Sequence, residues 1–268
     1  KHLAAAQKKL RRLNRWLARK QKGSKNWHKA KRKLARLHLR IANLRDFHWS
    51  SQSEFEERWI QASYELQALK RLDAIVVPFS DSSLAAHVML SFGFEDGRQL
   101  AVSVETRPEK GESYSLIGGA ARQLELIYLF GTERDLLGLR ILHRENRVYA
   151  FPLDVPPSFT RSLLLQLCES ANQLHEHPQF YATLRHNCTT TLLRQVNRVS
   201  DQPIAVSREI LFPAQLGELL HRLSFLDTNL NWPEAKEHFR VDETVRSAED
   251  LTRFSETLRS GRDAPTNP

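Results

Sequence analysis

The apolar positions of the first 45 residues recur every three or four residues, which is the spacing of an amphipathic helix. A polar break at Lys22–Asn26 separates two such stretches. The sequence therefore predicts a helical hairpin over residues 1–45. Its two apolar stripes consist of Leu10, Leu13, Trp16 and Leu17 in the first helix and Leu34, Leu37, Ile41 and Leu44 in the second.

From residue 72 the pattern changes to short apolar stretches and alternation, which are typical of β-strands. Strands are predicted at Leu72–Phe79, Ala85–Phe92 and Gln99–Arg107. The tight-turn signal Asp96-Gly97 lies between the last two, which should therefore form a hairpin. Further β structure is predicted at Leu124–Phe130, Leu136–Leu142 and Arg147–Leu153.

Helical spacing returns after Pro156, and a helix is predicted from there to about His177. A second helix should open at Asn187-Cys188, and a third helical pattern, Glu209–Leu226, is broken at Pro213. The last residues, about 30 in number, are charged and should end in a frayed tail. These elements predict an α+β fold in which helices pack on an antiparallel sheet.

The distribution of charge also separates the first 45 residues from the rest of the chain. Residues 1–45 contain 17 Lys and Arg and no Asp or Glu, whereas acidic residues outnumber basic ones in the remainder. We therefore expect a basic helical hairpin at 1–45, a second domain at 46–260 and a disordered tail at 261–268. A basic hairpin suggests contact with nucleic-acid phosphates. A solvated basic segment without a partner is the alternative.

Several classes of protein are excluded by composition. Two cysteines, Cys168 and Cys188, cannot make a disulfide-rich scaffold, although one disulfide between them is open, and no metal-type Cys pair is present. The sequence has no apolar stretch of 18 residues and no apolar signal-peptide core at its start.

Cys188 follows a residue suited to cap a helix and should lie in the first helical turn. There the unpaired amides and the helix dipole favour a thiolate over a thiol. Two interpretations are open: a nucleophile, or a small buried residue. Cys168, by contrast, shares the apolar side of its helix and is predicted to be core.

A cysteine nucleophile needs a base, and His87 is the strongest candidate because it interrupts an apolar strand. Alternation places His87 on one face with Met89 and Ser91. Pairing across the hairpin could bring Ser103 or Glu105 near the ring as an orienting acceptor. A satisfied core histidine is the alternative.

The N-terminal segment resembles the TnpB-type (OrfB) insertion-sequence proteins in Lys8–Asn26, Lys29–His38 and Ile41–Asn43. In that family this stretch is a helical insert of an RNA-guided nuclease. Residues 1–45 contain no carboxylate side chain, so nuclease activity does not carry over. The resemblance implies at most a nucleic-acid-binding fragment.

A second resemblance covers most of the chain, from about residue 41 to about residue 260, where several motifs fall in order. The chain is similar there to the Lnb N-terminal periplasmic domain family. The motifs are Ala86–Arg98, Ala101–Arg107, Glu109–Ser115, Leu124–Tyr128 with Glu133–Asp135, and Phe180–Thr190.

A histidine on a strand followed by Asn-Cys opening a helix is also similar to circularly permuted NlpC-type thiol enzymes, which include the lecithin:retinol acyltransferase group. The resemblance implies a permuted NlpC/papain-like fold and an acyl thioester, by which a lipid acyl group passes to a lipoprotein N-terminus. It assigns Cys188 as nucleophile and His87 as base, with Glu105 and Ser103 orienting His87. Asn187, or a backbone amide near Cys188, would stabilise the oxyanion.

A polar loop follows the strand hairpin and is a candidate lining of the substrate site, although a structural loop is an equally simple interpretation. The resemblance further implies no cofactor or metal, a phospholipid or lipoprotein partner at a membrane surface, and a periplasmic or inner-membrane location. Nucleic-acid binding through residues 1–45 and an inactive scaffold are the alternative functions. The loop residues are Arg107, Lys110, Glu112, Ser113 and Tyr114.

Overall fold

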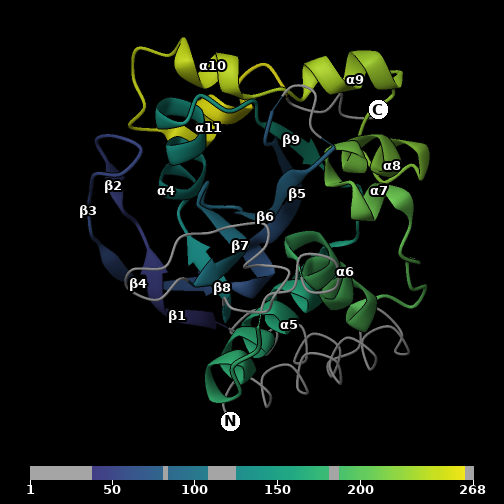
Figure 1. Cartoon of the computed structure of the whole chain (residues 1–268), viewed down its shortest axis with the longest axis horizontal. Helices are drawn as coiled ribbons and strands as arrows, with labels where there is room; N and C mark the ends of the chain where they lie inside the picture. Colours follow the sequence, from purple (N-terminus) through teal and green to yellow (C-terminus); the bar gives the residue numbers. More distant parts are fainter. Residues whose placement is uncertain (1–37, 81–83, 108–124, 181–186, 263–268) are drawn as a thin grey trace, which may run out of the picture.

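The structure is a computed structural model that describes residues 38–80, 84–107, 125–180 and 187–262. In these residues a seven-stranded, mostly antiparallel sheet is covered by helices on both faces (Figure 1). The predicted α+β class is therefore confirmed. Residues 1–37, which hold most of the predicted basic hairpin, lie outside the described residues.

The central sheet has the strand order β4-β1-β8-β7-β6-β5-β9. Its neighbouring strands are antiparallel except for β1 and β8, which meet in a single parallel pair at Arg45 and Gly131. A separate two-stranded sheet consists of β2 (His48–Trp49) and β3 (Phe55–Glu56). The seven strands are β1 (His38–Arg45), β4 (Trp59–Glu65), β5 (Leu69–Pro78), β6 (Ala86–Phe94), β7 (Gln99–Arg107), β8 (Glu125–Gly131) and β9 (Tyr149–Pro152).

The predicted β6–β7 hairpin is confirmed. Gly97 lies in the turn with φ of 81°, a conformation that glycine adopts without steric cost. The Phe94 amide donates to the Arg98 carbonyl at 3.0 Å and closes the turn. The register pairs Met89 with Ser103, which places Ser103 on the same face of the sheet as Met89.

Alternation along β6 divides the core between the two faces of the sheet. Val88, Leu90 and Phe92 pack in the larger core, whereas Met89 packs in the smaller one. Helices α5 (Pro157–Glu176), α6 (Cys188–Val199), α7 (Arg208–Leu211), α8 (Leu216–Arg222) and α9 (Trp232–His238), with the 3-10 turn η3 (Pro213–Gln215), cover the larger core. The smaller core is covered by α4 (Glu133–Gly138), η2 (Leu139–His143), α10 (Asp242–Arg246) and α11 (Phe254–Arg259). A further 3-10 turn, η1 (Leu66–Ala68), precedes β5.

The second helix of the predicted hairpin should extend to Leu44. This prediction is wrong for residues 38–45, which form β1. The pairing of β1 with β4 is irregular between Ile41 and Leu44. This β-bulge adds a residue, so that Leu44 returns to the buried side that Leu39 occupies. The resulting spacing of apolar residues imitates that of a helix.

The strand predicted at Leu136–Leu142 is also wrong, because these residues belong to α4 and the π-helical turn η2. Thr132 caps α4 by accepting a hydrogen bond from the Asp135 amide at 3.3 Å. Leu136, Leu139 and Ile141 are all buried, and a segment in which apolar residues occupy nearly every position shows no period to separate helix from strand.

The charged C-terminal region forms helices that contribute to the core. Helices α10 and α11 place Val245, Phe254 and Leu258 in the smaller core. Residues 263–268, most of the predicted disordered tail, lie outside the described residues.

A buried ion network ties α11 to the sheet. The Arg259 guanidinium lies 2.8 Å from the Asp73 carboxylate of β5 and 2.6 Å from the Glu133 carboxylate of α4. Both carboxylates are fully buried, and Ser91 of β6 donates a further hydrogen bond to Glu133 at 2.5 Å. Among the ion pairs of the described residues, Glu133 therefore depends on Arg259 alone, whereas Asp73 is also paired with Arg71 at 2.7 Å.

We expect Arg259→Ala to destabilise the protein by about 3–5 kcal/mol, because it leaves Glu133 buried without its cation and Asp73 with Arg71 alone. The matched control is Arg253→Ala, which removes an exposed ion pair to Glu256 and should cost at most about 1 kcal/mol. Urea denaturation of both variants measures the difference. Equal free energies of unfolding would contradict the role of Arg259.

Candidate active site

Cys188 is the first residue of α6, as predicted, and its neighbours form a complete capping box. The Asn187 side chain accepts a hydrogen bond from the Thr190 amide at 2.8 Å. The Thr190 hydroxyl in turn accepts from the Asn187 amide at 3.1 Å. This arrangement holds the start of the helix rigidly and fixes where the thiol points. The oxyanion role of Asn187 stays a prediction.

The Cys188 thiol lies where strands β6 and β7 separate. Their pairing extends only from Met89–Ser103 to the turn, so the first residues of β6 have no partner on that side. The sulfur lies 3.9 Å from the Ala86 carbonyl oxygen, and the nearby Val88 amide lowers the pKa of the thiol. It therefore takes the place that a continued β7 would occupy, between the two faces of the sheet.

His87 reaches the same sulfur from the smaller core. Its ring lies close enough to the Cys188 thiol for each group to shift the pKa of the other. Its Nε2 atom lies 2.7 Å from the Ser103 Oγ and 3.2 Å from the Glu105 Oε1. Because Nε2 is engaged with these two groups, Nδ1 is the ring nitrogen left for the thiol. The structure thus brings together Cys188, His87, Ser103 and Glu105.

Arg140 completes this polar chain, and the sequence interpretation missed it. The Ser103 hydroxyl donates to Glu105 at 2.7 Å, and the Arg140 Nη2 donates to the same carboxylate oxygen at 3.0 Å. Arg140 is itself buried and also donates to the Leu136 carbonyl at 2.9 Å. The available signal was a single arginine within an otherwise apolar stretch, which the strand prediction for Leu136–Leu142 obscured.

Charge within the site shifts the pKa values of all three titrating groups. Burial is the largest influence on His87 and lowers its pKa. The charge of the Glu105 carboxylate and the contacts that the ring makes with Cys188 and Glu105 outweigh burial and the repulsion of Arg140, and they raise that pKa to about 9. Burial raises the pKa of Glu105, whereas His87 and Arg140 together hold it well below its ordinary value.

The Cys188 thiol is acidified by the same contacts. Burial is the largest influence and raises its pKa, but the hydrogen bond and charge of His87, the Val88 amide and the Thr189 hydroxyl bring the pKa below its ordinary value. The site therefore favours a thiolate–imidazolium pair, which is the reactive form of a cysteine nucleophile.

Cys168 provides the contrast. It is buried in α5, and burial raises the pKa of its thiol to about 12. Both cysteines are free, so the disulfide that the sequence left open does not form. Cys168 is a core residue, as predicted.

The predicted substrate loop cannot be compared with the structure. Arg107 ends β7, and Lys110, Glu112, Ser113 and Tyr114 lie outside the described residues. Their role in lining the site stays a prediction. In the ranges that the structure describes, no group of three or more His, Cys, Asp and Glu side chains is placed to hold a metal ion.

Comparison with known families gives two matches. Residues 55–220, more than half of the chain, match the Lnb N-terminal periplasmic domain, and residues 1–51 match a family of probable transposases of the OrfB type. Both resemblances drawn from sequence motifs are thereby confirmed. No curated protein and no solved structure matches the chain. Among the described helices, none has the length and apolar character needed to span a bilayer.

The raised pKa of His87 predicts a pH-dependent stability, which is seen most cleanly in Cys188→Ala, where the thiol no longer titrates. The unfolded pKa is about 6.5. The imidazolium contribution is therefore fully present below pH 6.5 and is lost as pH rises through the folded pKa, which is about 9 in the wild type and lower in this variant, because the thiol that helps to raise it is missing. We expect the free energy of unfolding of this variant to fall across that window, by at most about 3 kcal/mol.

The matched comparison is the double variant Cys188→Ala/Glu105→Gln. It lacks the carboxylate charge that raises the pKa of His87, so its stability should fall less between pH 6.5 and pH 9. Denaturant titrations at several pH values measure both slopes, and groups elsewhere in the chain cancel in the difference. Identical slopes would show that Glu105 does not set the protonation of His87.

Proposed function

Because this chain belongs to the Lnb N-terminal periplasmic domain family, we propose that it is a thiol acyltransferase or hydrolase that acts through Cys188 and His87. The observation that carries the proposal is the proximity of the buried thiol to an imidazole that Ser103 and Glu105 hold in place: His87 lowers the pKa of Cys188, and Glu105 and Cys188 raise the pKa of His87. The sequence order, with the histidine strand before the cysteine helix, fits the permuted NlpC/papain-like arrangement.

In the first step the Cys188 thiolate attacks the carbonyl carbon of an acyl ester. The tetrahedral oxyanion collapses as the carbon–oxygen bond to the alcohol breaks. The departing alkoxide takes the proton held by the His87 imidazolium, which leaves an acyl thioester on Cys188 and a neutral imidazole. The amides of the first turn of α6 and its dipole suit the developing negative charge.

In the second step an amine or a water molecule attacks the thioester carbon, and His87 takes the proton that this nucleophile loses. The carbon–sulfur bond breaks and the thiolate is restored beside the imidazolium. Ser103 and Glu105 act on this cycle through His87, since they bond its Nε2 and hold Nδ1 toward the sulfur. They are positioning residues, and Arg140 keeps Glu105 ionised.

The family name supports a periplasmic location, and a phospholipid or lipoprotein is the acyl donor or acceptor that we propose. Transfer and hydrolysis differ only in whether an amine or water enters the second step. An inactive scaffold that has kept the fold is the competing interpretation, and it predicts that no acyl group becomes attached to Cys188.

We expect p-nitrophenyl octanoate to acylate Cys188, with a mass increase of one octanoyl group on the peptide that contains it. Cys188→Ala should abolish the product, whereas Cys168→Ala should retain it, because the pKa of Cys168 is about 12. His87→Ala should slow acylation by roughly 10²–10⁴-fold, the usual contribution of a general acid–base. Intact and peptide mass spectrometry measure the extent and the site.

Labelling that survives Cys188→Ala would contradict the assignment, and so would an unlabelled wild-type protein that is folded by circular dichroism. Ser103→Ala provides an intermediate test, since it removes the hydroxyl between His87 and Glu105 but leaves the direct 3.2 Å contact of these two residues. Its rate should lie between those of wild type and His87→Ala.

A second candidate function, nucleic-acid binding, is favoured by the match of residues 1–51 to probable transposases and by the basic charge of residues 1–45. We propose that residues 1–45 bind single-stranded RNA through the phosphate groups of its backbone. The test is truncation of residues 1–37, because truncation to residue 45 would remove β1 from the sheet. Filter binding at 50 and 200 mM salt should show that RNA binding weakens as the salt concentration rises and disappears on truncation. Unaltered binding by the truncated protein would reject this role.

A further inference from the structure

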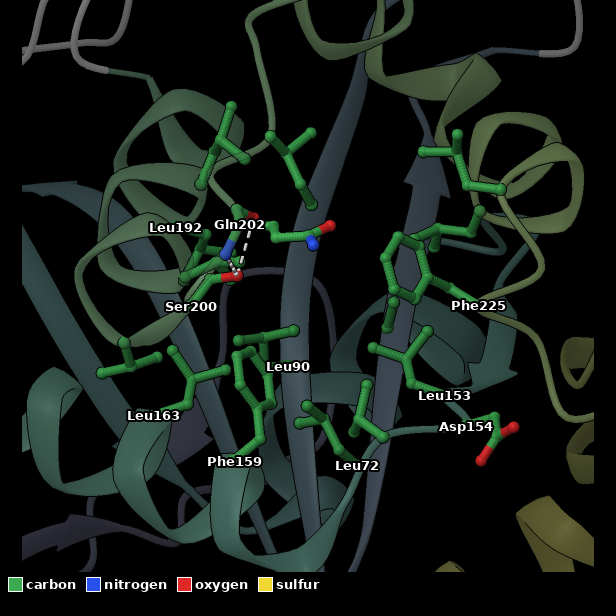
Figure 2. Close-up of a pocket in the computed structure, with 18 of the residues that line it drawn as sticks. Leu72, Leu90, Leu153, Asp154, Phe159, Leu163, Leu192, Ser200, Gln202 and Phe225 are labelled. Atoms are coloured by element: carbon green, nitrogen blue, oxygen red, sulfur yellow. Dashed lines mark hydrogen bonds between the residues drawn. The ribbon is translucent and has the colours of Figure 1, made fainter. Parts of the chain in front are cut away.

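A large apolar cavity lies on the face of the sheet covered by α5, α6 and α8, with a volume of ≈ 670 Å³. Figure 2 shows Leu72 and Leu90 at its floor, Leu163 and Leu192 on one side, and Phe225 on the other. This volume is within the range of small-molecule sites, roughly 300–1,000 Å³. The mechanism above makes no use of the cavity.

The cavity begins beside the thiol. Cys188 itself does not line the cavity, but two of the lining residues lie next to its thiol: Thr189, whose hydroxyl is 3.7 Å from the sulfur, and Val88, whose amide lowers the pKa of the thiol. A group bonded to the sulfur therefore has an apolar space directly next to it.

The cavity is also elongated. Its lining on α6 extends from Thr189 to Val199, a distance on the order of 15 Å at the rise of an α-helix. Leu192, Leu193 and Val196 lie between these two positions and face the same space. A site with this length and lining suits a flexible hydrocarbon chain better than a compact polar molecule.

The charged lining residues do not enter the interior. Asp154 and Asp201 are exposed, and Arg198 is exposed and bonded to Gln195 at 3.3 Å. The Ser200 hydroxyl and the Gln202 backbone satisfy each other at 2.7 and 3.2 Å (Figure 2). The two exposed carboxylates outnumber the one guanidinium of the lining and disfavour an anionic head group at the rim, so the polar end of an amphiphile is better placed at Cys188.

We propose that this cavity holds the single hydrocarbon tail of the acyl group whose carbonyl carbon is bonded by Cys188. The assignment of the tail to an acyl thioester rests on the proposed function, whereas the ability of the cavity to bind a chain does not. Val196 of α6 and Leu220 of α8 are half-buried lining residues at which an indole would fill the space. Leu211 of α7 is exposed, does not line the cavity, and provides the matched control.

The binding test uses Cys188→Ala, so that no chemistry occurs, with N-phenyl-1-naphthylamine as a neutral fluorescent reporter displaced by saturated methyl esters of 8, 10 and 12 carbons. Affinity should rise roughly fourfold for each methylene buried. Adding Val196→Trp or Leu220→Trp should weaken the 12-carbon ester at least tenfold, and adding Leu211→Trp should change it less than twofold. Affinities independent of chain length in Cys188→Ala, or unaltered by both tryptophans, would overturn the proposal.

A labelling test separates this proposal from the catalytic one. In the wild-type background, p-nitrophenyl acetate should label Cys188 equally with and without Val196→Trp, whereas p-nitrophenyl dodecanoate should label only the protein with an open cavity. Equal labelling by both esters in both proteins would overturn the cavity assignment and leave the thiol chemistry intact. Chain-length-dependent binding without labelling of Cys188 would support the cavity and reject the thiol chemistry.

Discussion

The contact between Cys188 and His87 joins two halves of the protein that the sheet otherwise separates. The helix that carries the cysteine packs on the larger core, and the histidine points into the smaller one. They meet because β6 and β7 stop pairing at Met89–Ser103, which leaves a gap in the sheet wide enough for a sulfur atom. The capping box at Asn187 then fixes the thiol in this gap.

The polar chain from His87 through Ser103 and Glu105 to Arg140 is costly to bury and is therefore fully connected. Each group satisfies its neighbour: the carboxylate stabilises the imidazolium, and the guanidinium stabilises the carboxylate. The charges that hold these four side chains together also lower the pKa of Cys188, so stability and reactivity have one physical origin. The network of Arg259, Asp73 and Glu133 lies on the same face and has a different role, anchoring the C-terminal helix.

The two faces of the sheet divide the proposed reaction between them. The smaller core contains the groups that hold and move the proton, and the larger core contains the apolar cavity. Cys188 lies between them, with the Val88 amide and the Thr189 hydroxyl on the cavity side and the imidazole on the other. The basic residues 1–45 fall within a different family match, which covers residues 1–51.

The sequence alone determined the elements with a clear period: the β6–β7 hairpin with its Asp96-Gly97 turn, the helix after Pro156, and Asn187 as the cap that places Cys188 in a first turn. It also indicated His87, because one polar residue in an apolar strand has few explanations. It could not decide Leu136–Leu142, where nearly every position is apolar and no period exists, or residues 38–45, where a bulge imitates helical spacing. Only the tertiary structure decided that Arg140 reaches Glu105 and that a cavity adjoins Cys188, because both depend on how far apart packed elements lie, a distance that local spacing does not record.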